Sequence, residues 1–337
     1  MSNINFNINS YATEEDWNSI LNTFREDSSH FKRIRYCYDL ILKIYKSARF
    51  QRTSIISNSL IFFHKYYIYN FFTNSNILIS LNEENDYNKD LAYISMACFF
   101  ISLKTSNYLL HIKFIIDKFC EFEKIQSEEE KSKIKDKVLA YESDILIRNN
   151  FSLEYELPYP FLKKILGLRD QAVLKFIIKN EKNAVLSNFC NDNDKIKHIK
   201  GKISEIVNFS FLFPFFLNFN TDTISLSCLK LALNKLKIQI NINDIINIIC
   251  NQKEKEFVSI DVNDINDIEI CSSLIDELVL SKIQKVKTHE EHNVNNINNI
   301  KKQNFFIANT EYDIGTKPKS ETKEKSKNET LLKKKRK

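Results

Sequence analysis

Apolar residues recur at helical spacing along most of the chain, with polar stretches between the apolar runs. A return every three or four residues is the period of an α-helix that buries one face. The stretch AYISMACFFISLKT, residues 92–105, differs because it is apolar on every side and carries no charge before Lys104. Such a helix is typical of the centre of a bundle. The pattern predicts helices over residues 14–24, 34–48, 53–72, 90–105, 109–122, 134–149, 161–178, 203–219, 222–236, 242–249 and 265–286, with polar connections at 82–88, 123–133 and 180–195.

The two halves of the chain resemble each other. SIISNSLIFF (54–63) shares Ser, Ile, Asn and Phe at the same offsets with SEIVNFSFLF (204–213), and YISMACFF (93–100) shares Ile, Ser and Cys with TISLSCLK (223–230). We therefore predict an all-α fold made by tandem duplication of a five-helix unit, in which four helices surround the third. The predicted divisions are an N-terminal segment over 1–24, a first unit over 25–155, a second unit over 156–288 and a disordered basic tail over 289–337.

The composition excludes several kinds of site. The chain has only three glycines, all isolated, so it lacks the glycine-rich loops that bind nucleotides. No two of its seven cysteines lie within four residues of each other, which argues against a zinc site or a redox pair. The longest apolar runs are about half the length of a membrane span. We expect no cofactor, no metal, no membrane contact, no signal peptide and no catalytic residue.

The charge of the chain is concentrated at its C-terminal end. The net charge is +6, and residues 301–337 contain twelve Lys/Arg and five Asp/Glu, so the body is close to neutral. A nucleic-acid-binding body would show a basic face of its own, so we expect nucleic-acid contact at most through the tail. The chain ends in a basic run that is typical of nuclear localisation signals, although a solvated lysine run or a non-specific arm explains it too. This run is Lys333, Lys334, Lys335, Arg336 and Lys337.

Two charged residues lie in unusual apolar surroundings. Lys104 ends the apolar helix, and its aligned position in the second half is Asn234, so the fold does not require lysine there. It either interacts with the helix dipole or contacts a partner. Glu142 lies within an apolar stripe, and its aligned position is Cys271. It either meets solvent or an internal lysine at the edge of the stripe, or faces backbone donors of a partner. The alignment predicts that only the first unit has such a lysine–glutamate surface.

A duplicated five-helix unit with a lysine closing the third helix and a glutamate inside the fifth resembles the cyclins. The sequence resembles the transcription-type K, T and L classes of cyclin over about residues 20–287. It differs from them after Lys104, where it has Thr105-Ser106-Asn107 and the family has Val-Glu-Glu or similar. The segments that carry it are FFHKYYIYNFF (62–72), SMACFFISLKT (95–105), VLAYESDILIRNNFSLEYELPYPFLKKIL (138–166) and ISLSCLKLALNKLKIQI (224–240).

The resemblance implies a regulatory subunit that binds and activates a cyclin-dependent kinase as a heterodimer and is not itself an enzyme. It also implies a nuclear kinase that phosphorylates the C-terminal repeat of RNA polymerase II. By the same resemblance, the kinase-binding residues are Lys104, Glu142, Thr105, Ser143 and Leu146, with the lysine donating to kinase carbonyls and the glutamate accepting from backbone N–H groups. The alternative is a cyclin-fold general transcription factor that bridges DNA and polymerase, which requires a basic face. A helical-repeat scaffold would need more than two repeats.

Overall fold

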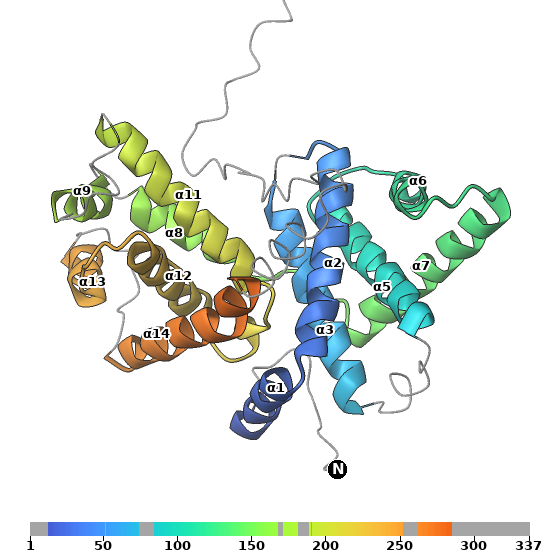
Figure 1. Ribbon diagram of the computed structural model, residues 1–337, viewed down its shortest axis with the longest axis horizontal. Helices are drawn as coiled ribbons and strands as arrows, with labels where there is room; N and C mark the ends of the chain where they lie inside the picture. The colour runs from blue at the N-terminus through green and yellow to red at the C-terminus, as the bar shows by residue number, and fades with distance from the viewer. Residues whose placement is uncertain are drawn as a thin grey trace, which may run out of the picture.

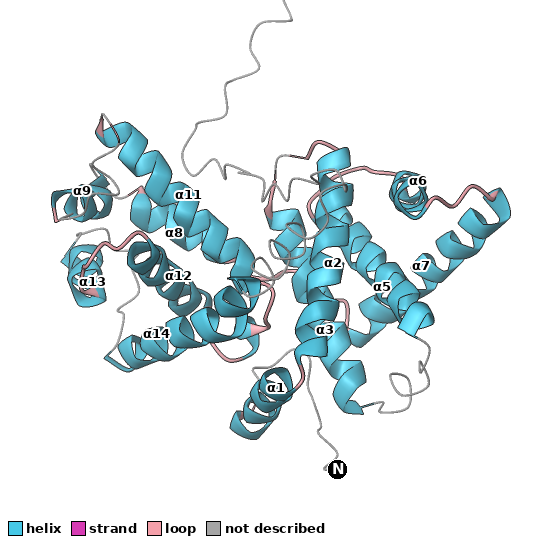
Figure 2. Cartoon of the chain, in the orientation of Figure 1, coloured by secondary structure: helices cyan, strands magenta, loops and turns pink. Residues whose placement is uncertain are grey.

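The chain folds into helices that gather in two bundles, with a separate N-terminal helix α1 (Glu14–Glu26) below them in the view of Figure 1. The computed structural model describes residues 13–50, 52–73, 84–167, 171–180, 189, 191–251 and 262–284. Over these ranges every regular element is helical and no strand occurs, as Figure 2 shows. The predicted all-α class is therefore confirmed, whereas the numerical domain boundaries stay a prediction.

The first bundle is built around α5 (Glu84–Thr105), whose stretch 92–103 is apolar on every side. Its side chains Ala92, Ala97 and Phe99 are fully buried, because other helices pack around it. Removing apolar surface from water on all sides of one helix is the main favourable contribution to the stability of such a bundle. The four helices that pack against it are α2 (Ser28–Ser47), α3 (Ser54–Thr73), α6 (Ile112–Glu123) and α7 (Glu128–Arg148).

The second bundle is built in a similar way around α12 (Thr221–Lys235). Nearly all of this helix is buried between Thr223 and Leu233. The helices that pack against it are α8 (Pro158–Leu166), α11 (Asp192–Ser210) and α14 (Val262–Ile275), which continues into a π-helical turn η3 (Asp276–Leu280). The remaining elements are α9 (Ala172–Lys179), the short 3₁₀ turn η2 (Phe215–Leu217) and α13 (Ile242–Asn251). Helix α9 packs against α8, α11 and α13.

Several helices begin earlier than the apolar pattern predicts, and three of them begin inside predicted connections. Helices α5, α7 and α11 start inside the stretches 82–88, 123–133 and 180–195, which were expected to be connections. The polar first turns of α7 and α11 are held by caps: Ser127 Oγ accepts from the backbone N–H of Glu130, and Asn191 Oδ1 accepts from that of Asp194. Acidic residues in these turns also interact favourably with the helix dipole. Because such turns bury little, hydrophobic periodicity does not detect them.

Glycine and proline break two of the predicted helices. The stretch 161–178 forms two helices, α8 and α9, that separate at Gly167. A Cβ at this position would lie 2.8 Å from the carbonyl oxygen of Lys163, so a larger residue would force the turn apart. In the stretch 203–219, α11 ends at Ser210 and Pro214 lies in the turn before η2, so the predicted helix is interrupted there.

Helix α1 belongs to the first half of the chain but packs its aromatic residues on the second. Its start is fixed by a capping box between Thr13 and Asp16. Trp17 lies edge-to-face against Phe213, at 5.6 Å between ring centroids, and against Phe219, at 5.9 Å. Edge-to-face aromatic pairs add stability beyond the apolar area that they bury.

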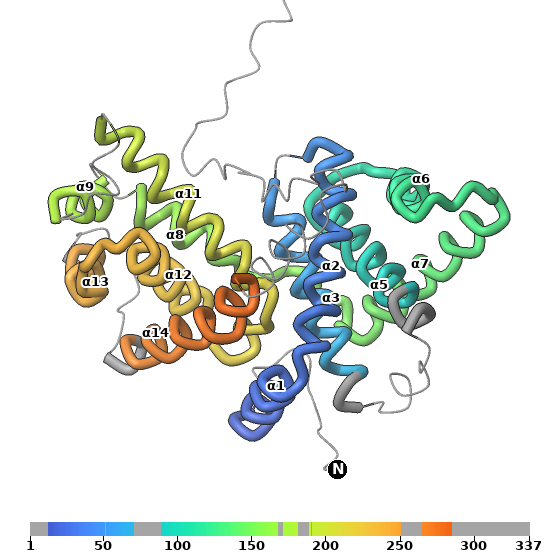
Figure 3. Tube along the Cα trace, in the orientation of Figure 1, coloured from blue at the N-terminus to red at the C-terminus, as the bar shows by residue number. Residues whose placement is uncertain are grey.

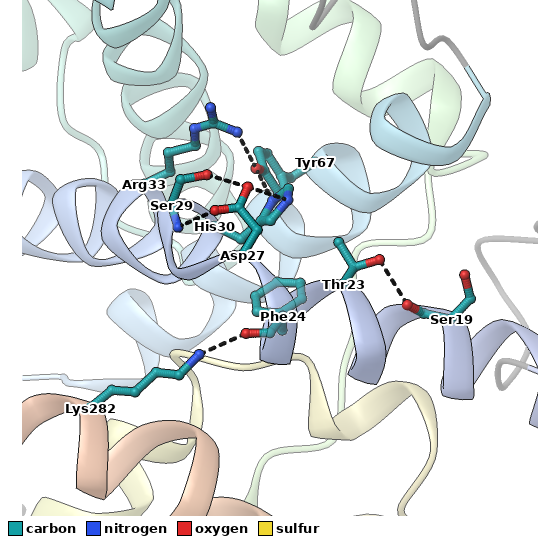
Figure 4. Close-up of polar contacts among 9 residues, drawn as sticks. All are labelled: Ser19, Thr23, Phe24, Asp27, Ser29, His30, Arg33, Tyr67 and Lys282. Carbon is teal, nitrogen blue, oxygen red and sulfur yellow. Dashed lines mark hydrogen bonds and ion pairs between the residues drawn. The ribbon is translucent and has the colours of Figure 1, made fainter.

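Polar contacts also join α1 to the end of the last helix. Arg25 makes two hydrogen bonds with the carboxylate of Glu277, at 2.9 and 3.0 Å. Lys282 Nζ donates to the carbonyl oxygen of Phe24 at 2.7 Å, as Figure 4 shows, and Asp27 caps the following helix through Ser29. In the trace of Figure 3 the end of the last helix reaches the junction of the bundles. Residues about 250 positions apart are thus held together.

The two bundles also touch directly through buried polar groups. Tyr159 on α8 bonds to Ser57 on α3 and donates to Asn208 on α11, each at 2.7 Å. His64 is fully buried, and its Nε2 lies 2.7 Å from the carbonyl oxygen of Phe211. Burial lowers the pKa of His64 to about 4. The ring is therefore neutral at pH 7, and Nε2 carries the proton because a carbonyl only accepts.

Lys65, the residue that follows His64, is a buried lysine at this junction. The residue is 7% exposed, and its Nζ lies 4.4 Å from the ring centroid of Tyr155. A cation above an aromatic face is attracted by the ring, but the ring does not replace the water that an ammonium group loses on burial. Burial accordingly lowers the pKa of Lys65 to about 8.

Candidate partner-binding site

Lys104 and Glu142 meet where α5 packs against α7. Nζ of Lys104 donates to Oε1 of Glu142 at 2.6 Å, which joins residues 38 positions apart. The lysine side chain is 54% exposed, whereas the glutamate side chain is only 9% exposed. The pair therefore presents a cation to solvent above a nearly buried carboxylate.

The end of α5 holds Lys104 in this place. The helix stops because Asn107 is left-handed, with φ of 59°, and the N–H of Tyr108 bonds back to the carbonyl of Leu103 at 2.9 Å. Lys104 thus lies in the last turn, where a cation interacts favourably with the helix dipole. Its Nζ lies 4.1 Å from the ring centroid of Phe100, one turn earlier. The ring and the helix end together aim the ammonium group toward α7.

Glu142 lies at the edge of the buried stripe of α7. Val138 and Ile145, its neighbours on the inner side, are fully buried. A carboxylate in such surroundings costs several kcal/mol unless it is paired, and Lys104 supplies the pairing. In the free chain Glu142 therefore meets an internal lysine, one of the alternatives that the sequence left open. Contact of either group with a partner stays a prediction.

The other three predicted site residues lie on the same two helices. Thr105 follows Lys104, is half-buried, and donates its hydroxyl to a carbonyl one turn earlier at 3.0 Å. Ser143 is exposed and bonds in the same way on α7 at 3.1 Å. Leu146 is half-buried one turn beyond Glu142. The structure thus gathers all five predicted residues along the α5–α7 edge, with both hydroxyls bonded to their own helices.

Three exposed apolar residues at the ends of the same elements were not predicted. Leu109 in the α5–α6 connection is fully exposed, and Ile147 and Phe151 at the end of α7 are 61% and 66% exposed. Among the described residues the only other large apolar side chain so exposed is Ile270. Exposed apolar side chains near a candidate site are candidates for contact with a partner. Ile147 could have been found from the sequence, because it follows Ser143 by one turn on the outer side of α7.

The turn after α7 adds strain at this place. Helices α5, α6, α7 and α12 each end with a left-handed residue and a backbone hydrogen bond that spans five residues. In three of these turns the apolar residue that donates the bond is buried or half-buried: Tyr108, Ile125 and Ile238. In the turn after α7 the donor is Phe151, and its side chain is exposed. Both Asn150 and Phe151 have positive φ there, of 49° and 55°. Positive φ costs of order 1–3 kcal/mol at a bulky residue, and such strain clusters at functional sites.

The second bundle has lysine–carboxylate pairs too, so the expectation that only the first unit has such a surface is wrong. Lys230 pairs with Glu269, and Lys235 pairs with Asp276 at 2.7 Å, each bridging α12 to α14 or its π-helical end. The alignment missed them because the long lysine side chains reach from positions near the aligned one. Their carboxylates are 54% and 43% exposed. The buried carboxylate distinguishes the pair in the first bundle.

Several other features bear on the kind of site. Among the described residues, no group of three or more His, Cys, Asp or Glu is arranged to hold a metal ion. Within the same ranges, no helix combines the length and apolar content that crossing a bilayer requires. Cys37 is fully buried, and burial raises its pKa to about 12, so it is an unreactive core residue. The basic run 333–337 lies outside the described residues.

Comparisons with known proteins give little beyond the fold itself. No family model matches the chain, and no curated protein matches it. Among solved structures, it is similar to a chain in the structure of the CAK complex from Chaetomium thermophilum bound to ATP-gamma-S, with 15% sequence identity and a TM-score of 0.47. The similarity covers 74% of this chain and 63% of that one, so less than two thirds of the matched chain's length is spanned. A likeness at this level carries no argument about function.

Proposed function

We propose that this chain is a cyclin, a regulatory subunit that binds and activates a cyclin-dependent protein kinase. The observation that carries the proposal is the Lys104–Glu142 pair, an exposed cation above a buried carboxylate at the α5–α7 edge. Leu109, Ile147 and Phe151 lie exposed at the ends of the elements that carry the pair. Protein interfaces combine apolar anchors with a few buried polar groups in this way.

The chemistry of the pair fits the backbone of a protein partner. An ammonium group has three N–H donors, and Glu142 accepts one of them, so the others are available to carbonyl oxygens of the kinase. The remaining acceptor positions of the carboxylate suit backbone N–H groups. Both contacts are charge-assisted, and they strengthen when docking excludes water. Binding would favour the kinase conformation whose regulatory helix is turned inward, where its glutamate meets the catalytic lysine.

The class of kinase is a finer part of the proposal. The segments 62–72 and 95–105 resemble the transcription-type cyclins, so we assign a kinase that phosphorylates the C-terminal repeat of RNA polymerase II. The basic run 333–337 supports a nuclear location. In this assignment the chain supplies binding energy and geometry, and the kinase supplies the chemistry.

Affinity purification of the tagged full chain from cells tests the proposal. We expect one protein kinase to co-purify with the wild-type chain, and to be lost with Lys104→Glu and with Glu142→Ala. The control is Glu128→Ala, which removes an exposed carboxylate from the same helix. Recovery of the same kinase in equal amounts with all three variants would show that the site is misassigned. Failure to recover any kinase with the wild-type chain would reject the function.

A further inference from the structure

Charge is strongly separated within the second bundle, although the whole body is close to neutral. Residues 158–210, which include α8, α9 and α11, contain ten Lys/Arg against five Asp/Glu. Residues 221–284, which include α12, α13 and α14, contain six against ten. The net charges are +5 and −4. These opposite charges cancel when the net charge of the whole body is summed. The sum therefore does not reveal that one part of the body is basic.

The basic part is formed by three helices that pack together. Helix α9 and the first half of α11 lie at the side of the second bundle away from the first bundle (Figure 1). Helix α8 begins at the bundle junction, where Tyr159 contacts Ser57, and packs against α9. The exposed lysines of the basic part lie on three different helices. They are Lys163 on α8, Lys175 and Lys179 on α9, and Lys197 on α11. Lys175 and Lys179 are one helical turn apart on the outer face of α9, opposite the buried Val173, Leu174 and Ile177.

The character of this surface separates it from a protein interface. Among the described residues, the large apolar side chains that are strongly exposed are Leu109, Ile147, Phe151 and Ile270, and none lies on α8, α9 or α11. A protein partner needs apolar anchors at the centre of its interface. A row of phosphates needs only cations spread over a face, which neutralise the backbone and release its counterions.

We propose that the basic end, formed by α8, α9 and the first half of α11, binds the phosphodiester backbone of a nucleic acid. It is a second binding surface, on the opposite bundle from the Lys104–Glu142 pair, and it does not depend on the kinase assignment. Contacts of this kind position a nucleic acid without reading its sequence. Their affinity falls steeply with salt, in proportion to the number of phosphates neutralised.

A pair of charge-reversal variants of the full chain tests the proposal, because both keep the basic tail. One carries Lys163→Glu, Lys175→Glu, Lys179→Glu and Lys197→Glu. The matched control carries Lys32→Glu, Lys43→Glu, Lys113→Glu and Lys135→Glu, four exposed lysines of the first bundle. Both have the same net charge, and their thermal stability is compared first. Binding of a fluorescent duplex DNA and of a single-stranded RNA of equal length is measured between about 50 and 200 mM salt.

We expect the first variant to bind at least about 10-fold more weakly than the control, with a salt slope lower by about one for each phosphate that is no longer neutralised. If the first variant binds DNA alone, RNA alone or both more weakly than the control, the proposed role of the basic end is supported. The nucleic acid affected identifies the ligand. Equal affinities and equal slopes for the two variants would overturn it and assign binding to the tail. Equally effective competition by polyglutamate for the wild-type chain would also overturn it, in favour of an acidic protein.

Discussion

Glu142→Ala is expected to weaken binding of the partner kinase by about 2–5 kcal/mol, which is about 30-fold or more in Kd. The variant removes an acceptor that is 9% exposed and leaves Lys104 without its partner at 2.6 Å. Truncating one member of a hydrogen-bonded charge pair at a desolvated interface raises the dissociation rate most. Titration calorimetry with the purified kinase measures the change.

A charge swap separates a binding role of the pair from a structural one. The double variant Lys104→Glu, Glu142→Lys restores an ion pair between α5 and α7 but reverses donor and acceptor. If the kinase contacts these groups directly, the double variant should be more thermally stable than Lys104→Glu alone. It should still fail to bind the kinase. Wild-type affinity in the swapped chain would show that the pair only holds the two helices together.

Lys65→Met is expected to stabilise the isolated chain by about 3 kcal/mol at pH 7. The pKa of the buried ammonium group falls from 10.5 to about 8, and each pKa unit corresponds to about 1.4 kcal/mol. Methionine keeps the length and apolar contacts of the side chain and removes the charge. Urea unfolding of both proteins measures the difference in the free energy of unfolding.

The stabilisation by Lys65→Met is expected to decrease as the pH rises. Because the pKa of Lys65 is lower in the folded chain than in the unfolded one, the destabilisation is fully present below about pH 8 and disappears as the pH rises to 10.5. The advantage of Lys65→Met should shrink over that interval. The control Lys43→Met, at an exposed position of α2, should change stability by less than about 0.5 kcal/mol at any pH. A constant advantage, or none at pH 7, would show that the ammonium group is well solvated.

Hydrophobic patterning predicted the helices because this fold buries a stripe on nearly every one of them. It also predicted α5 as a central helix, and it singled out Lys104 and Glu142 because charge is rare in apolar surroundings. Helix starts that depend on capping, such as Ser127 before α7, were missed since their first turns are polar. The break at Gly167 depends on a close backbone contact that no periodicity records.

The parts of the site that were missed depend on three-dimensional exposure. Phe151 follows the predicted helix 134–149, and only the strained turn after α7 shows that its side chain is left in solvent. The salt bridges of Lys230 and Lys235 were not predicted because neither lysine occupies the position that aligns with Lys104. Their long side chains reach carboxylates on the neighbouring helix. The basic end of the second bundle was hidden by a charge sum that averaged opposite regions.

The most direct test of the central claim is the rate of phosphate transfer by the co-purified kinase, measured with and without this chain. The substrate is a peptide carrying the RNA polymerase II repeat, with histone as the comparison. We expect saturating wild-type chain to raise the rate on the repeat peptide, whereas Glu142→Ala at the same concentration should not raise it. A rate that stays unchanged while calorimetry shows the wild-type complex fully formed would contradict the central claim.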